Sequence, residues 1–251
     1  MLTQVLPVRS RRQEFPVASR IQQSLLAQIE KRALICWAER TPVWINPDHL
    51  TALGFTAQLL AGLCYLLSRS GRLWLLMAIG CLALNWFGDS MDGTLARVRK
   101  SERPRYGFYV DHMLDSIGAA ALVLGLANSG YMSGPVATGL LVSFLLLSIQ
   151  SYLAACVFGE FRMSFWSLGP TELRLLLAVG SLALFRWPMV FGGYRLFDVG
   201  GVIGTLGMAA MLGCFSLRNA VRLYREEAPI PAARPSDRLA QNHQSNGQKD
   251  G

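Results

Sequence analysis

Residues 73–96 read LWLLMAIGCLALNWFGDSMDGTLA, an apolar run that carries two aspartates, Asp89 and Asp92, near its end. About 20 apolar residues are enough for a helix to cross a bilayer, so this stretch predicts a transmembrane helix. A charged side chain inside such a helix costs roughly 2.5–3.5 kcal/mol on insertion scales, and a function is expected to retain it. The stretch therefore predicts a membrane protein with a site inside the membrane.

Further apolar runs of similar length flank this one on both sides. Together the runs cover roughly residues 50–68, 73–96, 108–129, 135–158, 172–192 and 196–217. The composition agrees, because 52% of the residues are hydrophobic and only 16% are charged, which lies outside the usual range of soluble domains. We expect an all-α membrane protein with six transmembrane helices.

An amphipathic helix is expected over residues 21–37, before the first transmembrane helix. Ile21, Leu25, Ile29, Leu34 and Trp37 fall on one face of this helix, which should lie along the membrane interface. The alternative is a helix that packs on other parts of the protein. The predicted organisation is a cytoplasmic segment over 1–48, a six-helix transmembrane domain over 49–225 and a disordered cytoplasmic tail over 226–251.

Basic residues predict the orientation in the membrane. Of the 24 Lys and Arg, 20 fall in the segments 1–48, 97–105, 159–174 and 218–249, and four fall in the turns on the other side. The positive-inside rule then places both termini in the cytoplasm, and we expect a bacterial inner membrane. Much of the net charge of +8 is explained in this way. No nucleic-acid partner is expected, because the basic residues lack interleaved aromatic residues.

Four aspartates lie near the junction of the second and third predicted transmembrane helices. Asp89 and Asp92 are three residues apart, and Asp111 and Asp115 are four apart, so each pair projects from one helix face. The connection contains Pro104 and predicts a hairpin that turns at the cytoplasmic surface. The basic residues of this connection are Arg99, Lys100, Arg103 and Arg105, which suit anionic lipid or a phosphorylated substrate.

Two facing aspartate pairs would form one site. Carboxylates crowded together respond by protonating or by holding cations, and ligand sets of oxygen alone favour Mg2+ or Mn2+ over zinc or copper. His112 is left out of the ligand set because it lies about 100° from Asp111 around the helix, and it is expected to be a packing or interfacial residue.

Small residues share the faces of the aspartates. Gly93, Ala96 and Gly107 leave room for a ligand between the helices. Arg97 lies at the cytoplasmic mouth, where its guanidinium can neutralise a phosphate or extend to lipid headgroups. The groove suits a pyrophosphate and a metal-assisted displacement at phosphorus.

The pattern Asp89-x2-Asp92-Gly93-x2-Ala96-Arg97-x9-Gly107-x3-Asp111-x3-Asp115 resembles the signature of the CDP-alcohol phosphotransferase family at all eight positions. An amphipathic helix followed by six spans is also similar to the architecture of that family. The segment Ile45–Thr51 resembles the Pro-Asn-x-Leu-Thr segment of relatives, although its order is Asn46-Pro47.

The resemblance implies an enzyme of phospholipid biosynthesis that transfers a substituted phosphate from a CDP-linked donor to an alcohol, with release of CMP. It implies two divalent cations held by Asp89, Asp92, Asp111 and Asp115, with Asp115 as the general base. Gly93, Ala96, Arg97 and Gly107 would line the CDP pocket. A homodimer is also implied.

The sequence does not decide which donor and which acceptor the enzyme would use. CDP-diacylglycerol is favoured by the short chain, and CDP-choline or CDP-ethanolamine with diacylglycerol as acceptor is the alternative. A polar acceptor would be glycerol 3-phosphate, an inositol, an inositol phosphate, serine or another alcohol.

Two charged residues, Glu172 and Arg174, open the fifth predicted transmembrane helix. A cation in a first turn opposes the helix dipole, so both residues are candidates for contact with the acceptor or the head group. Simple anchoring at the interface is the alternative. An alternative of another functional class is a cation-coupled transporter, although the sequence carries no inverted repeat.

Overall fold

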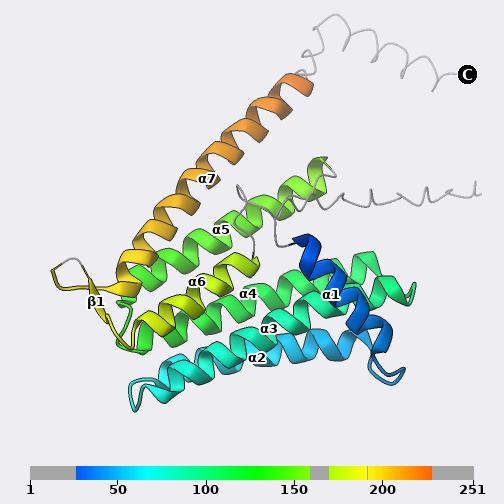
Figure 1. Cartoon of the computed structure of the whole chain (residues 1–251). Coiled ribbons are helices and arrows are strands. Elements are labelled where there is room, and N and C mark those ends of the chain that lie inside the picture. The colour runs from blue at the N-terminus through cyan, green and yellow to red at the C-terminus, as the bar shows by residue number, and fades with distance from the viewer. Residues whose placement is uncertain (1–26, 159–169, 191, 228–251) are drawn as a thin grey trace, which may run out of the picture. The chain divides into compact units, whose positions relative to one another are not determined.

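The computed structural model describes residues 27–158, 170–190 and 192–227, which form helices and one short β-hairpin (Figure 1). In chain order the elements are α1 (Ala27–Arg40), α2 (Pro47–Leu67), α3 (Leu73–Val98), α4 (Pro104–Asn128), α5 (Gly134–Phe158), α6 (Pro170–Ala183), β1 (Met189–Val190), β2 (Tyr194–Arg195) and α7 (Leu196–Glu226). The chain divides into two compact units, Met1–Gly213 and Cys214–Gly251.

Within the described residues, five helices are long and apolar enough to cross a membrane, namely α2, α3, α4, α5 and α7. The predicted all-α class and these five spans are confirmed. Many leucines of these helices are exposed, as expected of side chains that face lipid rather than water; Leu146 and Leu153 of α5 are examples. The chain is therefore an integral membrane protein by the length and composition of its helices.

The sixth predicted span, over residues 172–192, is not confirmed as one long helix. Helix α6 contains 14 residues and ends at Ala183, which gives it a length of only about 21 Å. The chain then turns through Pro188, and β1 pairs with β2 in an antiparallel hairpin. Gly192 and Gly193 adopt positive φ angles of 78° and 127°, which favour glycine and allow the turn. Hydropathy alone did not distinguish this turn from a continuing helix.

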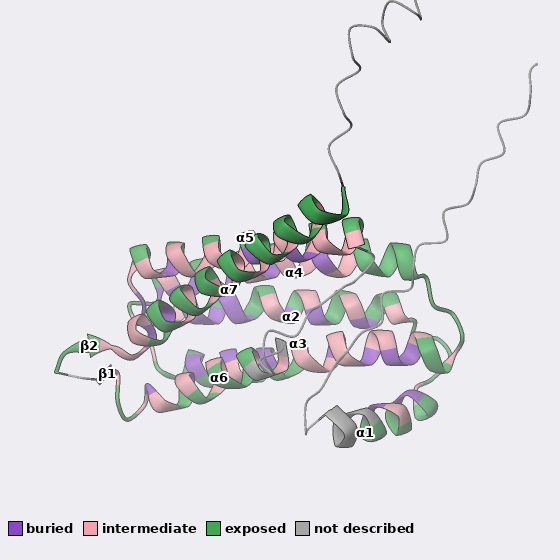
Figure 2. Ribbon diagram, turned by 90° about the horizontal axis from the view of Figure 1, so that it is seen from above, coloured by how far each residue is buried: buried purple, intermediate pink, exposed green. Residues whose placement is uncertain are grey.

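Helices α2, α3 and α4 carry most of the buried residues, and α2 lies between the other two and packs against both (Figure 2). A Cβ atom added to Gly88 of α3 would lie 2.7 Å from the Cα of Gly54 in α2, so only glycine allows this approach. Beside this contact, the buried Asn85 side chain donates a hydrogen bond of 2.9 Å to the Gly54 carbonyl. The helix that carries Asp89 is thus fixed against α2 one turn away from that carboxylate.

The predicted N-terminal amphipathic helix corresponds in part to α1, while residues 21–26 lie outside the described part of the chain. Leu34 and Ala38 of α1 are buried and share a cluster with Leu50, Met91 and Leu95. One side of α1 thus packs against α2 and α3. The described tail ends at Glu227, so the predicted disorder of the remaining tail lies outside the described residues. A position of α1 at the membrane interface stays a prediction.

Candidate functional site

The four aspartates of the sequence pattern lie in the second half of α3 and the first half of α4, near enough for their charges to interact. Helix α3 ends at Val98 and α4 begins at Pro104, so a short turn brings their ends together. The charge of Asp115 interacts with those of Asp111, Asp89 and Asp92. The charge of Asp92 also interacts with those of Asp89 and Asp111. The pairs on the two helices therefore share one electrostatic environment, which we call the acidic cluster.

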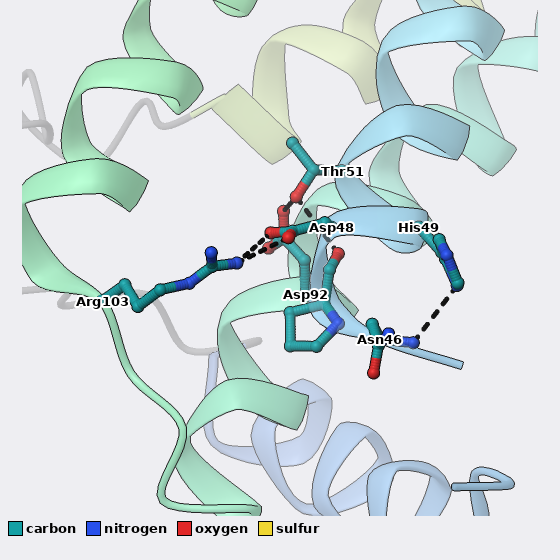
Figure 3. A network of polar contacts seen from close by, with 7 residues as sticks. Asn46, Asp48, His49, Thr51, Asp92 and Arg103 are labelled. Carbon is teal, nitrogen blue, oxygen red and sulfur yellow. Dashed lines mark hydrogen bonds and ion pairs between the residues drawn. The ribbon is translucent and has the colours of Figure 1, made fainter. Parts of the chain in front are cut away.

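Asp92 is held by a third helix as well as by its own. The Thr51 hydroxyl of α2 donates a hydrogen bond of 2.6 Å to Asp92 Oδ2, and Figure 3 shows the Thr51 side chain directed at this carboxylate. The Gly93 N–H donates to Asp92 Oδ1 at 2.5 Å. Both carboxylate oxygens are thereby oriented. The sequence pattern did not indicate Thr51 as a site residue, although its segment resembles one that is common in relatives.

The start of helix α2 places Thr51 beside Asp92. Pro47 occupies the start of the helix, where a missing N–H does no harm. His49 Nδ1 accepts a hydrogen bond of 3.3 Å from the Asn46 N–H (Figure 3). One turn after Pro47, the Thr51 hydroxyl lies 3.2 Å from the Pro47 carbonyl as well as facing Asp92. The Asn-Pro order thus supports a capped helix start beside the acidic cluster.

Asp89 contacts a residue from α6. Arg174 Nη1 donates a hydrogen bond of 2.8 Å to Asp89 Oδ2 in an ion pair. The two side chains are only 13% and 29% exposed, so the pair is sheltered from water. This contact gives the sheltered Arg174 a partner of opposite charge. The side chain of Glu172, the other candidate in this turn, is not among those described.

Asp111, His112 and Asp115 form a group whose potential ligand atoms lie within 4.8 Å of one another. The His112 ring is buried and lies 4.3 Å from the Phe108 ring and 4.8 Å from the Tyr152 ring of α5. Its Nδ1 atom lies 3.4 Å from Asp111 Oδ2. The tilted contacts with two aromatic rings agree with a packing role for His112. One of its ring nitrogens nevertheless lies within 4.8 Å of the ligand oxygens of both aspartates, so the structure does not support its exclusion from the possible ligand set.

By the predicted topology, Arg97 and the small residues Gly93, Ala96 and Gly107 lie toward the cytoplasmic side of the aspartates. A Cβ atom added to Gly93 would lie 3.5 Å from Arg97 Nη1, so the guanidinium lies beside Gly93. Arg97 is exposed and donates a hydrogen bond of 3.2 Å to the Thr94 hydroxyl. At Gly107 no described atom lies within 4 Å of the Cβ position. Ala96 is partly exposed on the same turn of α3 as Gly93. These positions leave room beside the acidic cluster.

The basic connection between α3 and α4 has a structural role. Arg99 donates hydrogen bonds to the carbonyls of Thr41, Pro42 and Ile45 and so fixes the loop between α1 and α2. Arg103 forms an ion pair with Asp48 of α2, shown in Figure 3. The hydrogen bond to Asp48 raises the pKa of Arg103. Arg99 and Arg103 are thus engaged within the protein, which weakens the prediction that this loop binds a phosphorylated substrate.

Comparison with known proteins agrees with the fold and this arrangement. The chain belongs to the CDP-alcohol phosphatidyltransferase family, whose model matches residues 44–215. It therefore carries the membrane domain of a transferase, and its acidic cluster lies inside the matched region. A curated relative, the archaetidylinositol phosphate synthase of Pyrococcus horikoshii, is 30% identical over 86 residues, which cover 34% of this chain and 43% of the relative. The chain thus aligns with less than half of that relative.

Proposed function

We propose that this chain transfers a phosphatidyl group from CDP-diacylglycerol to the hydroxyl group of a polar alcohol, with release of CMP, as a step of phospholipid biosynthesis. The observation that carries the proposal is the grouping of four aspartates from α3 and α4 within the region that matches the family. Membrane-spanning helices beside this group suit a donor whose acyl chains stay in the bilayer.

The acidic cluster fits divalent metal ions. Four carboxylates bring a formal charge of −4, and among the described side chains Arg174 offsets one unit of it by an ion pair. Oxygen ligands suit Mg2+ or Mn2+. The ligand atoms of Asp111 and Asp115 are close enough for shared coordination. We expect Asp89, Asp92, Asp111 and Asp115 to hold two such ions, which when bound would neutralise the diphosphate of the donor and favour attack at its phosphorus.

Asp115 is the proposed general base. The hydroxyl oxygen of the acceptor would form a new bond to the phosphorus that carries diacylglycerol, and the hydroxyl proton would pass to the Asp115 carboxylate. The bond that breaks joins this phosphorus to the bridging oxygen, whose electron pair leaves with CMP. Asp115 is partly buried and interacts electrostatically with all three other aspartates, which supports its place next to the reacting groups.

Gly93, Ala96, Arg97 and Gly107 are proposed to line the CDP pocket. The open space at Gly107 would admit the nucleotide, and Arg97 beside Gly93 would neutralise phosphate charge. Thr51 would keep Asp92 oriented during this binding, because its hydroxyl already occupies Asp92 Oδ2.

For the acceptor we propose a phosphorylated polyol, with an inositol phosphate as the first compound to test. The support is the relative whose name describes the synthesis of archaetidylinositol phosphate. Glu172 and Arg174 are the proposed contacts to the head group, since Arg174 is sheltered beside the acidic cluster. The proposed location is the cytoplasmic side of a bacterial inner membrane, in a homodimer.

The test is an assay of CMP release by the full chain in detergent or vesicles. CDP-diacylglycerol and Mg2+ or Mn2+ would be incubated with inositol phosphate, inositol, glycerol 3-phosphate or serine, and the lipid product identified by mass spectrometry. We expect CMP and a phosphatidyl product with one polar alcohol, and no reaction after chelation of the metal. A chain that instead uses CDP-choline or CDP-ethanolamine with diacylglycerol would overturn the assigned donor, and absence of CMP under every condition would overturn the whole proposal.

A further inference from the structure

Arg174 of α6 carries a positive charge that is sheltered from water. It lies four residues after Pro170, the first described residue of that helix. The side chain is 13% exposed, and a sheltered charge in a membrane protein requires a partner. Its described partner is Asp89 of α3, at 2.8 Å from Nη1 to Oδ2.

The same guanidinium acts on more than one carboxylate. Its charge interacts favourably with Asp115 on α4, while Asp89, Asp92 and Asp111 repel Asp115. Helix α6 packs against α3, so the guanidinium is presented by a neighbouring helix rather than by a distant loop. One cation from α6 thus offsets part of the repulsion within the acidic cluster.

We propose that Arg174 is the resident counter-ion of the acidic cluster and that it competes with a divalent metal ion for Asp89. This inference rests on the proposed function, in which Asp89 is a metal ligand. A guanidinium and a divalent cation repel each other, so each weakens the interaction of the other with a shared carboxylate. Metal binding would weaken the contact between Arg174 and Asp89, and loss of Arg174 would strengthen metal binding by the same linkage.

The first experiment measures Mn2+ affinity of the full chain in detergent, from the electron paramagnetic resonance signal of free Mn2+. Arg174→Gln removes the charge and should bind Mn2+ about tenfold more tightly than the original chain. Arg174→Lys keeps the charge and should stay close to the original affinity. Arg186→Gln removes an exposed charge beyond the other end of α6 and should leave the affinity unchanged.

The second experiment needs no variant. Phenylglyoxal, an arginine-selective reagent, would be applied to the original chain with and without Mn2+, and modified peptides counted by mass spectrometry. Modification of Arg174 should increase several-fold with Mn2+ because the ion pair is released, whereas modification of Arg186 should not change. Unchanged modification of Arg174 at saturating Mn2+ would overturn the inference even if the glutamine variant does not fold.

The two proposals fail in different ways. If the original chain binds Mn2+ but Arg174→Gln binds it equally or more weakly, the counter-ion role is wrong and the proposed function stands. If the original chain binds no Mn2+, both proposals are wrong. An affinity gain shared by Arg174→Lys and Arg174→Gln would also contradict the inference, because it would show that charge is not the cause.

Discussion

At the scale of single residues, the acidic cluster is oriented by side chains that carry no negative charge themselves. Thr51 and Arg174 come from α2 and α6, and each contacts one oxygen of an aspartate on α3. A carboxylate that must hold a metal ion benefits from a neutral donor such as Thr51, because the hydrogen bond limits its rotamers before the ion arrives. The charged Arg174 orients Asp89 in the same way but, as the proposed counter-ion, opposes metal binding there. The contribution of each contact can be measured with a substitution that removes one functional group.

Thr51→Val removes the hydroxyl group and keeps the shape of the side chain. Hydrogen bonds to charged groups contribute roughly 1.5–3 kcal/mol, so CMP release should fall by about 10- to 100-fold if the orientation of Asp92 matters for turnover. Thr51→Ser keeps a hydroxyl and should retain most activity. Steady-state kinetics of both variants checks this, and equal rates for Thr51→Val and the original chain would contradict it.

Asp115→Asn tests the proposed base. The amide keeps the size of the side chain but cannot accept the proton, so turnover should fall by ~100- to 10,000-fold with the fold retained. Asp198→Asn is the matched control, because Asp198 accepts a hydrogen bond from the Ser133 N–H away from the acidic cluster and an asparagine still offers an oxygen. Turnover of Asp115→Asn near that of the control would remove Asp115 from the proton transfer.

At the scale of elements, glycines decide how closely the helices that carry the site approach one another. Gly88 of α3 meets the backbone of α2, whereas Gly80 of the same helix is exposed with no described atom within 4 Å of its Cβ position. The two positions therefore separate the effect of packing from the effect of helix propensity.

Gly88→Ala should destabilise the protein by roughly 1–3 kcal/mol, because the new methyl group overlaps the Gly54 backbone. Gly80→Ala should leave stability unchanged or raise it by about 0.5–1 kcal/mol. Thermal unfolding in detergent checks both variants. A lower melting temperature for Gly80→Ala than for Gly88→Ala would contradict the packing argument.

Arg99→Ala should loosen the loop between α1 and α2, because this guanidinium donates to three carbonyls of that loop. Faster amide hydrogen exchange over residues 41–46 is the expected result, measured by mass spectrometry. Lys100→Gln, a change at the exposed neighbour in the same turn, serves as the control. Exchange that is equally slow in all three proteins would show that the loop is held by other contacts.

Much of the helical fold followed from hydropathy, because long apolar runs have few stable alternatives in a bilayer. The spacing of Asp89, Asp92, Asp111 and Asp115 likewise indicated one cluster before any coordinates. The short α6 was not predicted, since Pro188 and the glycine pair end the helix in a stretch that is still apolar. The roles of Thr51 and Arg99 were also missed, because such contacts join residues 41 and 54–58 positions apart.

At the scale of the whole molecule, the predicted topology would require α6 to take part in a crossing. The basic residues predict both termini on the cytoplasmic side, which needs an even number of crossings. Among the described helices five meet the length of a full span, and α6 is the remaining apolar one. Since the described α6 is only about 21 Å long, local thinning of the bilayer would be needed for this crossing.

Fusions to the two ends of the chain test this topology. Green fluorescent protein should fluoresce at either terminus, and alkaline phosphatase should be inactive at either terminus, because the first reporter folds in the cytoplasm and the second matures outside it. An active phosphatase at one end alone would show an odd number of crossings and place α6 on one side of the membrane.

The contacts of Thr51 and Arg174 also limit how this chemistry can be moved to another protein. A helical hairpin of residues 73–128 carries every aspartate of the cluster, yet it lacks the threonine that aligns Asp92 and the arginine that balances Asp89. Grafted alone into a designed scaffold, it would present a set of uncompensated anions. A scaffold that is to carry this site must therefore also supply the threonine and the arginine from two flanking helices.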